Sequence, residues 1–414
     1  MNGFVFLQPH MGMTERQLFQ KYLAQTSDAP LGLEIVKAEG SYIYDVHGKS
    51  YMDLISGIAV SNVGHRNPKV VEAIKYQVDH YMHVMVYGEY IQSPQVKLAE
   101  ALISTTKSSL LNQVYFTNSG TEAVEGAMKL AKRFTGRREF ISCKNAYHGA
   151  SQGALSLAGD ENFKHSFRPL LPDMRMIRHG HVEDLTFITK NTAAIFIEIV
   201  GGEAGVQQAS KAYFQALRKK CDETGCLLVI DEIQTGFGRT GTFWAYEAME
   251  IFPDILLSAK GMGGGMPIGA FISREEIMRT LSFEPVLGHI TTFGGHPVSC
   301  AASLATLNFI LENDLLAQIP EKSALFKSLL IHPMILELRG IGLMLALEMK
   351  DFKTVKSVID LCIERGLITD WFLFCDNALR IAPPLTIGLD EIKKACNIML
   401  QAMNDILARD LRVL

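Results

Sequence analysis

The chain has 414 residues and a formal net charge of −4, and 48% of its residues are hydrophobic while 20% are charged. This composition is typical of a folded globular protein and excludes an intrinsically disordered chain. Because 44 acidic residues outnumber 40 basic ones, the sequence gives no sign of the basic surface that nucleic-acid binding requires, and we expect no nucleic-acid partner. At about 150 residues per domain, the length is enough for two to three domains.

The N-terminus and the cysteines bear on the compartment. The N-terminal sequence MNGFVFLQPHM has no basic region before its short apolar run, which predicts that it is not a signal peptide. No segment approaches the ~18 consecutive apolar residues of a membrane-spanning helix. The 7 cysteines include no Cys-x-x-Cys pair, so we expect free thiols in a reducing compartment and no metal site. We therefore expect a soluble, cytoplasmic protein with no membrane partner.

In chain order, residues 31–55 alternate between apolar and polar side chains and predict short strands, with a turn at His47–Lys49. From about residue 95, strand-like runs alternate with helical periodicity. The expected strands are 113–117, 139–143, 193–198, 226–230, 254–257 and 268–272, and the expected helices are 121–134 and 211–224. Beyond residue 300 we expect a helix over 299–312, strand material over 337–349 broken at Gly340 and Gly342, and a last helix over 389–408.

Alternating strands and helices predict an α/β fold with a mostly parallel central sheet and helices on both of its faces. The two terminal segments differ in character from this central part, and we expect them to pack together beside it. In such a sheet, ligands bind at the carboxyl ends of the strands.

Two polar clusters follow apolar strands. Asp231 and Glu232 come after the run CLLVI, at a strand edge of this kind, although a helix cap or a surface pair is the alternative interpretation. Lys260 comes after the run DILLSA. Because a buried ammonium is costly, a lysine at such an edge can lose its proton and form a Schiff base with a carbonyl. A solvated lysine in a loop is the alternative. The glycines at 261 and 263–265 leave space for a bulky group.

Two glycine-containing segments are candidates for phosphate binding. Thr117–Ala123 places small hydroxyl residues and Gly120 before an amphipathic helix, whose N-terminal N–H groups and dipole favour an anion. Simple helix capping is the alternative. Gly236–Gly241 matches the G-x-G-x-x-G dinucleotide pattern by letter. That pattern should follow a strand directly and open a helix, whereas residues 231–235 intervene here, so we do not expect NAD binding.

The first three clusters fit one cofactor, pyridoxal 5'-phosphate (PLP). PLP requires a lysine for its aldehyde, an acid for its pyridine nitrogen and an anion cradle for its phosphate. Lys260, Asp231 and the segment that precedes Thr121 supply these groups at strand–helix or strand–loop junctions of one α/β region. An acid that keeps the ring nitrogen protonated allows the ring to accept electrons from a substrate carbanion.

Four longer motifs carry a resemblance to a known family. They are NSGTEAVEGAMKLAKRFTG at 118–136, LLVIDEIQTGFGRTG at 227–241, PDILLSAKGMGGGMPIGA at 253–270 and TTFGGHP at 291–297. From about residue 30 to residue 400, the chain resembles class III PLP-dependent aminotransferases, the group of acetylornithine, ornithine and 4-aminobutyrate aminotransferases. The resemblance implies the PLP-dependent transferase fold type I, with a large PLP-binding domain over 57–306, a smaller α+β domain built from 1–56 and 307–414, and a homodimer with shared active sites.

The resemblance also implies roles for matching residues that bind the cofactor. Lys260 would carry PLP and shuttle the substrate proton, and Asp231 would pair with the pyridine nitrogen. Ser119, Gly120 and Thr121 would receive the phosphate.

Other matching residues would surround the ring. Tyr147, next to His148 in a cofactor-binding motif, would stack on one face of the ring. Ile233 would pack on the other face, and Gln234 would reach the ring hydroxyl. Thr292 would cross to the phosphate of the neighbouring subunit.

Arg380 would bind a substrate carboxylate, and Glu203 would be the switch partner that neutralises it when no carboxylate is bound. Three departures from the family concern this region. The family usually has Glu-Pro-x-Gln-Gly-Glu where this chain has EIVGGE at 198–203, which changes the local loop. His296 stands where an asparagine is usual, and Ala150 stands where several relatives carry an arginine. The loss of that arginine removes an anchor for a carboxylate at the far end of the substrate.

We therefore expect a transaminase with a ping-pong mechanism. An amine or ω-amino acid would give its amino group, and 2-oxoglutarate or another oxo acid would receive it. The alternatives are an aminomutase, a decarboxylase or a racemase on the same fold, and a PLP-fold protein that only binds. The Glu203–Arg380 pair favours transamination because it suits two alternating substrates, and the intact Lys260 and Asp231 argue against a non-catalytic protein. The sequence leaves open the amino donor, the choice between 2-oxoglutarate and pyruvate, and any assembly beyond a dimer.

Overall fold

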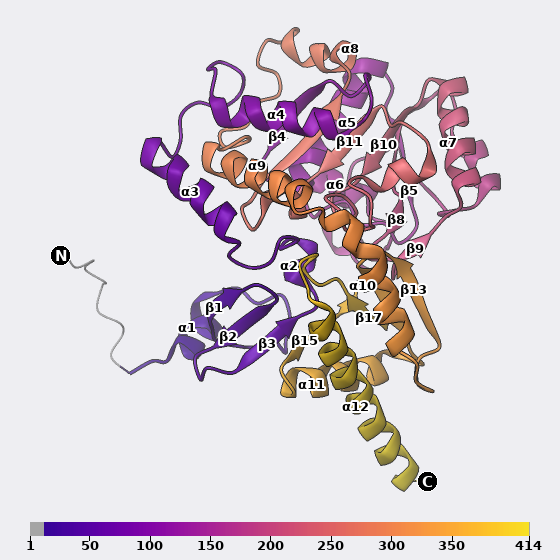
Figure 1. Ribbon diagram of the computed structural model, residues 1–414. Coiled ribbons are helices and arrows are strands. Elements are labelled where there is room, and N and C mark those ends of the chain that lie inside the picture. Colours follow the sequence, from indigo (N-terminus) through magenta and orange to yellow (C-terminus); the bar gives the residue numbers. More distant parts are fainter. Residues whose placement is uncertain (1–11, 414) are drawn as a thin grey trace.

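The computed structural model describes residues 12–413, and Figure 1 shows how their helices and strands are arranged. The N-terminal segment in which we expect no signal peptide lies outside the described residues. Within the described part of the chain, no helix is long and apolar enough to cross a membrane. All seven cysteines lie in that part, and they are free thiols, as the sequence predicts.

A seven-stranded sheet forms the centre of the fold. Its order is β4 (Gln113–Thr117), β12 (Gly269–Ser273), β11 (Ile255–Ser258), β10 (Leu227–Asp231), β7 (Thr192–Glu198), β5 (Glu139–Cys143) and β6 (Met174–Ile177). β12 runs antiparallel to both of its neighbours, and the other neighbouring strands are parallel. The mostly parallel sheet predicted from the sequence is therefore confirmed. β6 was not predicted, because its sequence MRMI is short and interrupted by an arginine.

Helices cover both faces of this sheet (Figure 1). Successive strand residues point to opposite faces, so that Phe196 belongs to one apolar cluster and its neighbours Ile195 and Ile197 belong to the other. The first cluster includes residues of α5 (Gly120–Thr135) and α6 (Gln152–Leu157). The second cluster includes residues of α3 (Pro68–His80), α4 (Ser93–Thr105), α7 (Lys211–Thr224) and α9 (Pro297–Glu312).

The two terminal segments lie side by side in the lower half of Figure 1. One sheet has the order β1 (Ile35–Glu39), β2 (Tyr42–Asp45), β3 (Ser50–Asp53) and β15 (Leu367–Ile368). A second has the order β13 (Glu337–Ile341), β14 (Met344–Glu348), β17 (Cys375–Ile381) and β16 (Trp371–Phe372), beside α10 (Leu315–Leu329), α11 (Phe352–Glu364) and α12 (Leu389–Val413). Because β3 pairs in parallel with β15, the start and the end of the chain share one sheet. The exact domain boundaries stay a prediction.

Two terminal elements differ in detail from the expectation. Residues 337–349 form the antiparallel hairpin of β13 and β14, which turns at Gly342, whereas Gly340 stays within β13. The last helix continues to Val413 rather than ending near residue 408. The remaining short elements are α1 (Glu15–Tyr22), α2 (Ser56–Ala59), α8 (Glu275–Met278), β8 (Val200–Gly201), β9 (Gln207–Gln208) and the 3-10 helices 165–167, 182–187, 245–249, 260–263 and 279–282.

Candidate active site

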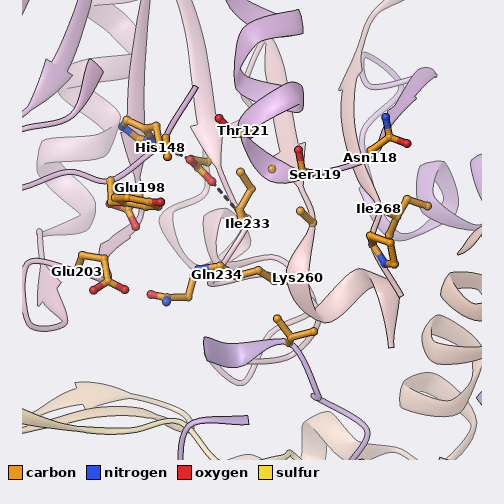
Figure 2. Close-up of a pocket in the computed structure, with 18 of the residues that line it drawn as sticks. Asn118, Ser119, Thr121, His148, Glu198, Glu203, Ile233, Gln234, Lys260 and Ile268 are labelled. Atoms are coloured by element: carbon orange, nitrogen blue, oxygen red, sulfur yellow. Dashed lines mark hydrogen bonds and ion pairs between the residues drawn. The ribbon is translucent and has the colours of Figure 1, made fainter. Parts of the chain in front are cut away.

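A cavity of about 500 Å³ opens at the carboxyl ends of β7, β10 and β11 (Figure 2). Ten of the twelve residues that the sequence singled out line it. They are Ser119, Gly120, Thr121, Tyr147, His148, Glu203, Asp231, Ile233, Gln234 and Lys260. The other two, Arg380 and Thr292, are not among its lining residues.

Lys260 reaches the cavity from the segment that directly follows β11. Its backbone has a φ of +46°, which is strained for a residue with a side chain and is a conformation that recurs at functional sites. The surrounding protein removes water from the ammonium and lowers the pKa of Lys260, and the nearby Glu203 offsets part of this effect. A lysine with a lowered pKa supplies the neutral amine that attacks a carbonyl.

Asp231 is the last residue of β10, and two hydrogen bonds fix its carboxylate. Its Oδ1 accepts from the backbone N–H of Ile233 at 2.9 Å, and its Oδ2 lies 2.7 Å from Nδ1 of His148. Both side chains are almost fully buried. Burial alone would lower the pKa of His148, but the hydrogen bond and charge of Asp231 outweigh it and raise that pKa. The cavity therefore contains a carboxylate that a histidine holds in one orientation.

The N-terminus of α5 faces the cavity and combines capping with space for an anion. Ser119 caps the helix, since its Oγ accepts from the backbone N–H of Glu122 at 3.3 Å. Helix capping, the alternative interpretation of this segment, is therefore present. A Cβ at Gly120 would lie 2.8 Å from Cδ1 of Ile233, and a Cβ at Gly149 would lie 2.3 Å from Oγ1 of Thr121. The two glycines therefore leave the backbone at the helix start open. Such a helix start binds phosphate groups through its N–H groups and dipole.

Gln234 and Tyr147 complete the wall of the cavity towards Glu203. Gln234 is buried, and its Oε1 packs against Gly202. A Cβ on residue 202 would lie 1.8 Å from this oxygen, so a side chain at that position would clash with Gln234. Burial raises the pKa of Tyr147, so that its phenol remains neutral. The structure thus places these two side chains together with Ile233 around the same space.

Glu203 and Arg380 form a buried, two-pronged ion pair. Nη1 of Arg380 donates to Oε1 of Glu203 and Nη2 donates to Oε2, each at 2.9 Å. Burial opposes the ionisation of Glu203, but the charge of Arg380 outweighs burial and lowers the pKa of Glu203. Arg380 lies in β17 and reaches the cavity only through Glu203, which lines it. The switch role of the pair stays a prediction.

Thr292 is exposed and lies outside the cavity of its own chain. Its neighbour Thr291 accepts a hydrogen bond from Nδ2 of Asn118 at 3.1 Å, which fixes this loop next to the start of α5. The contact of Thr292 with a neighbouring subunit stays a prediction.

The dinucleotide-like segment 236–241 has a packing role. Arg239 is fully buried and donates to the carbonyl oxygens of Leu343 at 2.9 Å and Pro383 at 2.5 Å and to Oδ1 of Asn62 at 2.6 Å. Burial lowers the pKa of Arg239 to about 9. Through Arg239 the segment therefore connects the central part of the fold to the C-terminal segment, and among the described residues no helix begins directly after it.

Glu198 is a cavity residue to which the sequence analysis gave no role. It is the last residue of β7 and pairs in register with Asp231, so both carboxylates lie at one sheet edge. Its Oε1 accepts from the N–H of Gly202 at 3.1 Å, and burial raises the pKa of Glu198 to about 7. An acid at the end of an apolar strand was the signal that identified Asp231, and the same signal would have identified Glu198.

The lysine, the fixed carboxylate and the open helix start fit the three requirements of PLP, and together with the doubly wound sheet they define a PLP-dependent enzyme. Comparison with known proteins narrows the class: the family model Aminotransferase class-III matches residues 22–403, and the chain belongs to this PLP-dependent family. The predicted family, enzyme class and cofactor are therefore confirmed.

Relatives of known name match almost the whole chain. The acetylornithine aminotransferase of Methanopyrus kandleri is 40% identical over 387 residues, which cover 92% of this chain and 97% of the relative. That of Caldanaerobacter subterraneus is 36% identical over 401 residues, covering 94% and 98%. Among solved structures, the ornithine aminotransferase of Toxoplasma gondii superposes with a TM-score of 0.88 at 27% identity, covering 95% of this chain and 94% of that chain.

Proposed function

We propose that this aminotransferase takes the amino group of an amine, or the ω-amino group of an amino acid of the ornithine and acetylornithine kind, and gives it to 2-oxoglutarate. The observation that carries the proposal is the buried Glu203–Arg380 pair beside the cavity that holds Lys260. A site that alternates between a substrate with an α-carboxylate and one without it needs an arginine that can bind the carboxylate of the first and be neutralised by a protein carboxylate when the second is bound. The relatives named acetylornithine and ornithine aminotransferase support the same assignment.

The protein groups that would hold PLP divide into three sets. Lys260 would bind it covalently through Nζ, Asp231 would hold the proton on the ring nitrogen, and the start of α5 at 119–121 would bind the phosphate. Tyr147 and Ile233 would enclose the ring. When bound, PLP supplies an electron sink for the carbon next to the reacting nitrogen.

The chain's own contributions to the reaction are proton transfer, orientation and charge compensation. Lys260 would take the proton from the substrate carbon and return it, since burial keeps its amine neutral. His148 would hold the Asp231 carboxylate in place through the 2.7 Å contact. Glu203 would move away from Arg380 when a substrate α-carboxylate enters, and would return when an ω-amine without a carboxylate at that distance enters, because an unpaired buried guanidinium is costly.

Ala150 would limit the choice of amino donor. Ala150 lines the cavity, and among the described lining residues the basic side chains are those of His148 and Lys260, both of which have other roles. The carboxylate of acetylornithine or 4-aminobutyrate that lies opposite the reacting amino group would therefore lack a basic anchor among the residues that line the cavity, apart from those two. A charge-assisted hydrogen bond contributes roughly 1.5–3 kcal/mol, so we expect weaker use of these donors than in relatives with an arginine here.

We also propose a homodimer in which each site is completed by the other subunit. The segment 82–96 and the loop near Phe293 are joined, since the rings of His83 and Phe293 lie 4.8 Å apart and Nε2 of Gln95 donates to the carbonyl of Gly295. Together they expose large apolar side chains, among them Ile91 at 96% and Phe293 at 51% exposed. Exposed apolar surface of this kind is typical of an interface, and Thr292 lies within it. The cytoplasmic location stays a prediction.

The test is to mix the holoenzyme with single amines and to follow the visible absorbance of PLP. We expect ornithine-like amines and glutamate to bleach it and 2-oxoglutarate to restore it, with pyruvate as the comparison acceptor. The matched variant Ala150→Arg should raise kcat/KM for 4-aminobutyrate and acetylornithine about tenfold. A wild-type enzyme that already uses 4-aminobutyrate best would contradict the donor assignment, and release of carbon dioxide from an amino-acid substrate would indicate a decarboxylase instead.

A further inference from the structure

Arg380 has a second carboxylate beside it, which the sequence analysis did not identify. Oδ1 of Asp370 lies 3.0 Å from Nε of Arg380, whereas Glu203 occupies the Nη1 and Nη2 edge of the same guanidinium. Burial alone would lower the pKa of Arg380, but Asp370 and Glu203 reverse this effect and raise it. Arg380 is thus compensated from two sides.

The hairpin of β16 and β17 fixes the two residues to each other. The backbone N–H of Arg380 donates to the carbonyl of Asp370 at 2.8 Å, and Oγ1 of Thr369 donates to the carbonyl of Arg380 at 2.6 Å. Asp370 therefore remains the cross-strand neighbour of Arg380 whatever occupies the cavity. The same hairpin also holds Glu203, whose Oε2 accepts from the N–H of Leu373 at 3.1 Å and whose carbonyl accepts from the N–H of Phe374 at 3.1 Å. Unlike Asp370, however, Glu203 lies on a different segment of the chain from Arg380.

The remaining sides of the guanidinium are also occupied. Its central carbon lies 4.6 Å from the ring centroid of Phe372, and Nη2 donates to the carbonyl of Trp371 at 3.3 Å. A guanidinium over an aromatic face is held by its charge and by its flat shape. Only the two-pronged edge that faces Glu203 is therefore available for exchange with a substrate carboxylate.

The contact between Asp370 and Arg380 is ionic rather than a well-aligned hydrogen bond. Oδ1 of Asp370 is buried and accepts no hydrogen bond from any described residue, and Nε of Arg380 likewise donates none, although the two atoms are only 3.0 Å apart. The side chain as a whole keeps 26% of its surface exposed. Asp370 is therefore a carboxylate at Nε of Arg380, next to the Nη1 and Nη2 edge that Glu203 occupies.

We propose that Asp370 is a positioning residue that keeps Arg380 paired and correctly oriented while Glu203 and a substrate carboxylate exchange. Without it, the guanidinium would have Glu203 as its one counter-ion, so that the exchange would pass through an uncompensated buried charge. Asp370 thereby assists substrates with an α-carboxylate and does nothing for amines that lack one. The proposal deepens the proposed function and rests on it.

The test measures carboxylate binding separately from turnover. Asp370→Ala in the PLP-loaded enzyme should weaken the binding of glutarate, a non-reacting dicarboxylate, about tenfold by titration calorimetry. It should raise KM for 2-oxoglutarate by a similar factor with kcat within about twofold of wild type, and the half-reaction with a simple amine should not change. Asp370→Asn, which keeps an acceptor oxygen without the charge and preserves the shape, should fall between wild type and Asp370→Ala. Asp376→Ala, an exposed aspartate in the same hairpin, is the control and should match wild type.

Three results with the variants would overturn the inference, and so would one result with the wild type. They are unchanged glutarate affinity, tighter glutarate binding, which would make Asp370 a repelling charge, and an equal loss in the amine half-reaction, which would indicate a general structural defect. If wild type binds glutarate and the variants weaken it as expected but no substrate pair is transaminated, the proposed function fails while the role of Asp370 stands. A wild type that does not bind glutarate refutes the role.

Discussion

The substitution Arg380→Lys isolates what the two-pronged geometry of Arg380 contributes. It keeps a positive charge between Glu203 and Asp370 but removes the planar pair of donors that Glu203 occupies at 2.9 Å on each side. The charge matters for folding, because Arg380→Ala would leave two carboxylates without a counter-ion, which costs about 3–5 kcal/mol for a broken buried pair. The lysine variant should therefore fold while losing one of the two charge-assisted hydrogen bonds.

The expected size follows from that lost bond. One charge-assisted hydrogen bond contributes roughly 1.5–3 kcal/mol, so kcat/KM for the glutamate half-reaction should fall about tenfold to hundredfold in Arg380→Lys. An amine without an α-carboxylate leaves Glu203 in place, and its half-reaction should change by less than about twofold. The assay is rapid mixing of holoenzyme with glutamate or with the amine, followed by the bleaching of PLP absorbance.

The control for Arg380→Lys is its folding stability. The thermal midpoint of Arg380→Lys should be compared with wild type, so that a folding defect is recognised. If both half-reactions slow by the same factor while the midpoint is unchanged, Arg380 does not discriminate between the two substrates, and the switch role of Glu203 is wrong.

Two further substitutions test the cofactor site. Asp231→Asn should retain PLP but slow proton abstraction about 100-fold or more, because a neutral amide does not stabilise the charged ring nitrogen; near-normal single-turnover rates would disprove the role. Thr292→Ala should weaken PLP retention, and dilution of the wild type to monomers should release the cofactor, as measured by gel filtration with absorbance detection. A monomer that retains PLP and turns over normally would argue against shared sites.

The local pattern of the sequence predicted most of the central sheet and three parts of the cavity, namely Asp231, Lys260 and the start of α5, whereas the other predicted cavity residues came from the family resemblance. Asp231 and Lys260 could be placed because each ends an apolar strand, and strands that end at one edge bring their last residues together. Helix α5, expected over 121–134, spans 120–135, because its apolar face is a local signal; its cap at Ser119 was not predicted. These features depend on neighbours within about one turn or one strand.

The parts that were missed depend on contacts between distant segments. Asp370 is ten residues before Arg380, and only the pairing of β16 with β17 brings the two together. That Arg380 reaches the cavity through Glu203, 177 residues away in the chain, is likewise a tertiary fact. No periodicity signals such pairs, and a short strand such as β6 carries too few residues to show a pattern.

Lys260 is the residue on which the proposed chemistry depends most, because it would carry PLP. Borohydride reduction of the holoenzyme, followed by trypsin digestion and mass spectrometry, identifies the lysine that is bound to the cofactor. Because a modified lysine resists trypsin, we expect the pyridoxyl mass on one peptide that spans residues 240–274 and contains Lys260 as its internal lysine. Lys260→Ala should take up no label and show no turnover. Label on any other lysine, or a Lys260→Ala enzyme that still transaminates, would contradict the central claim.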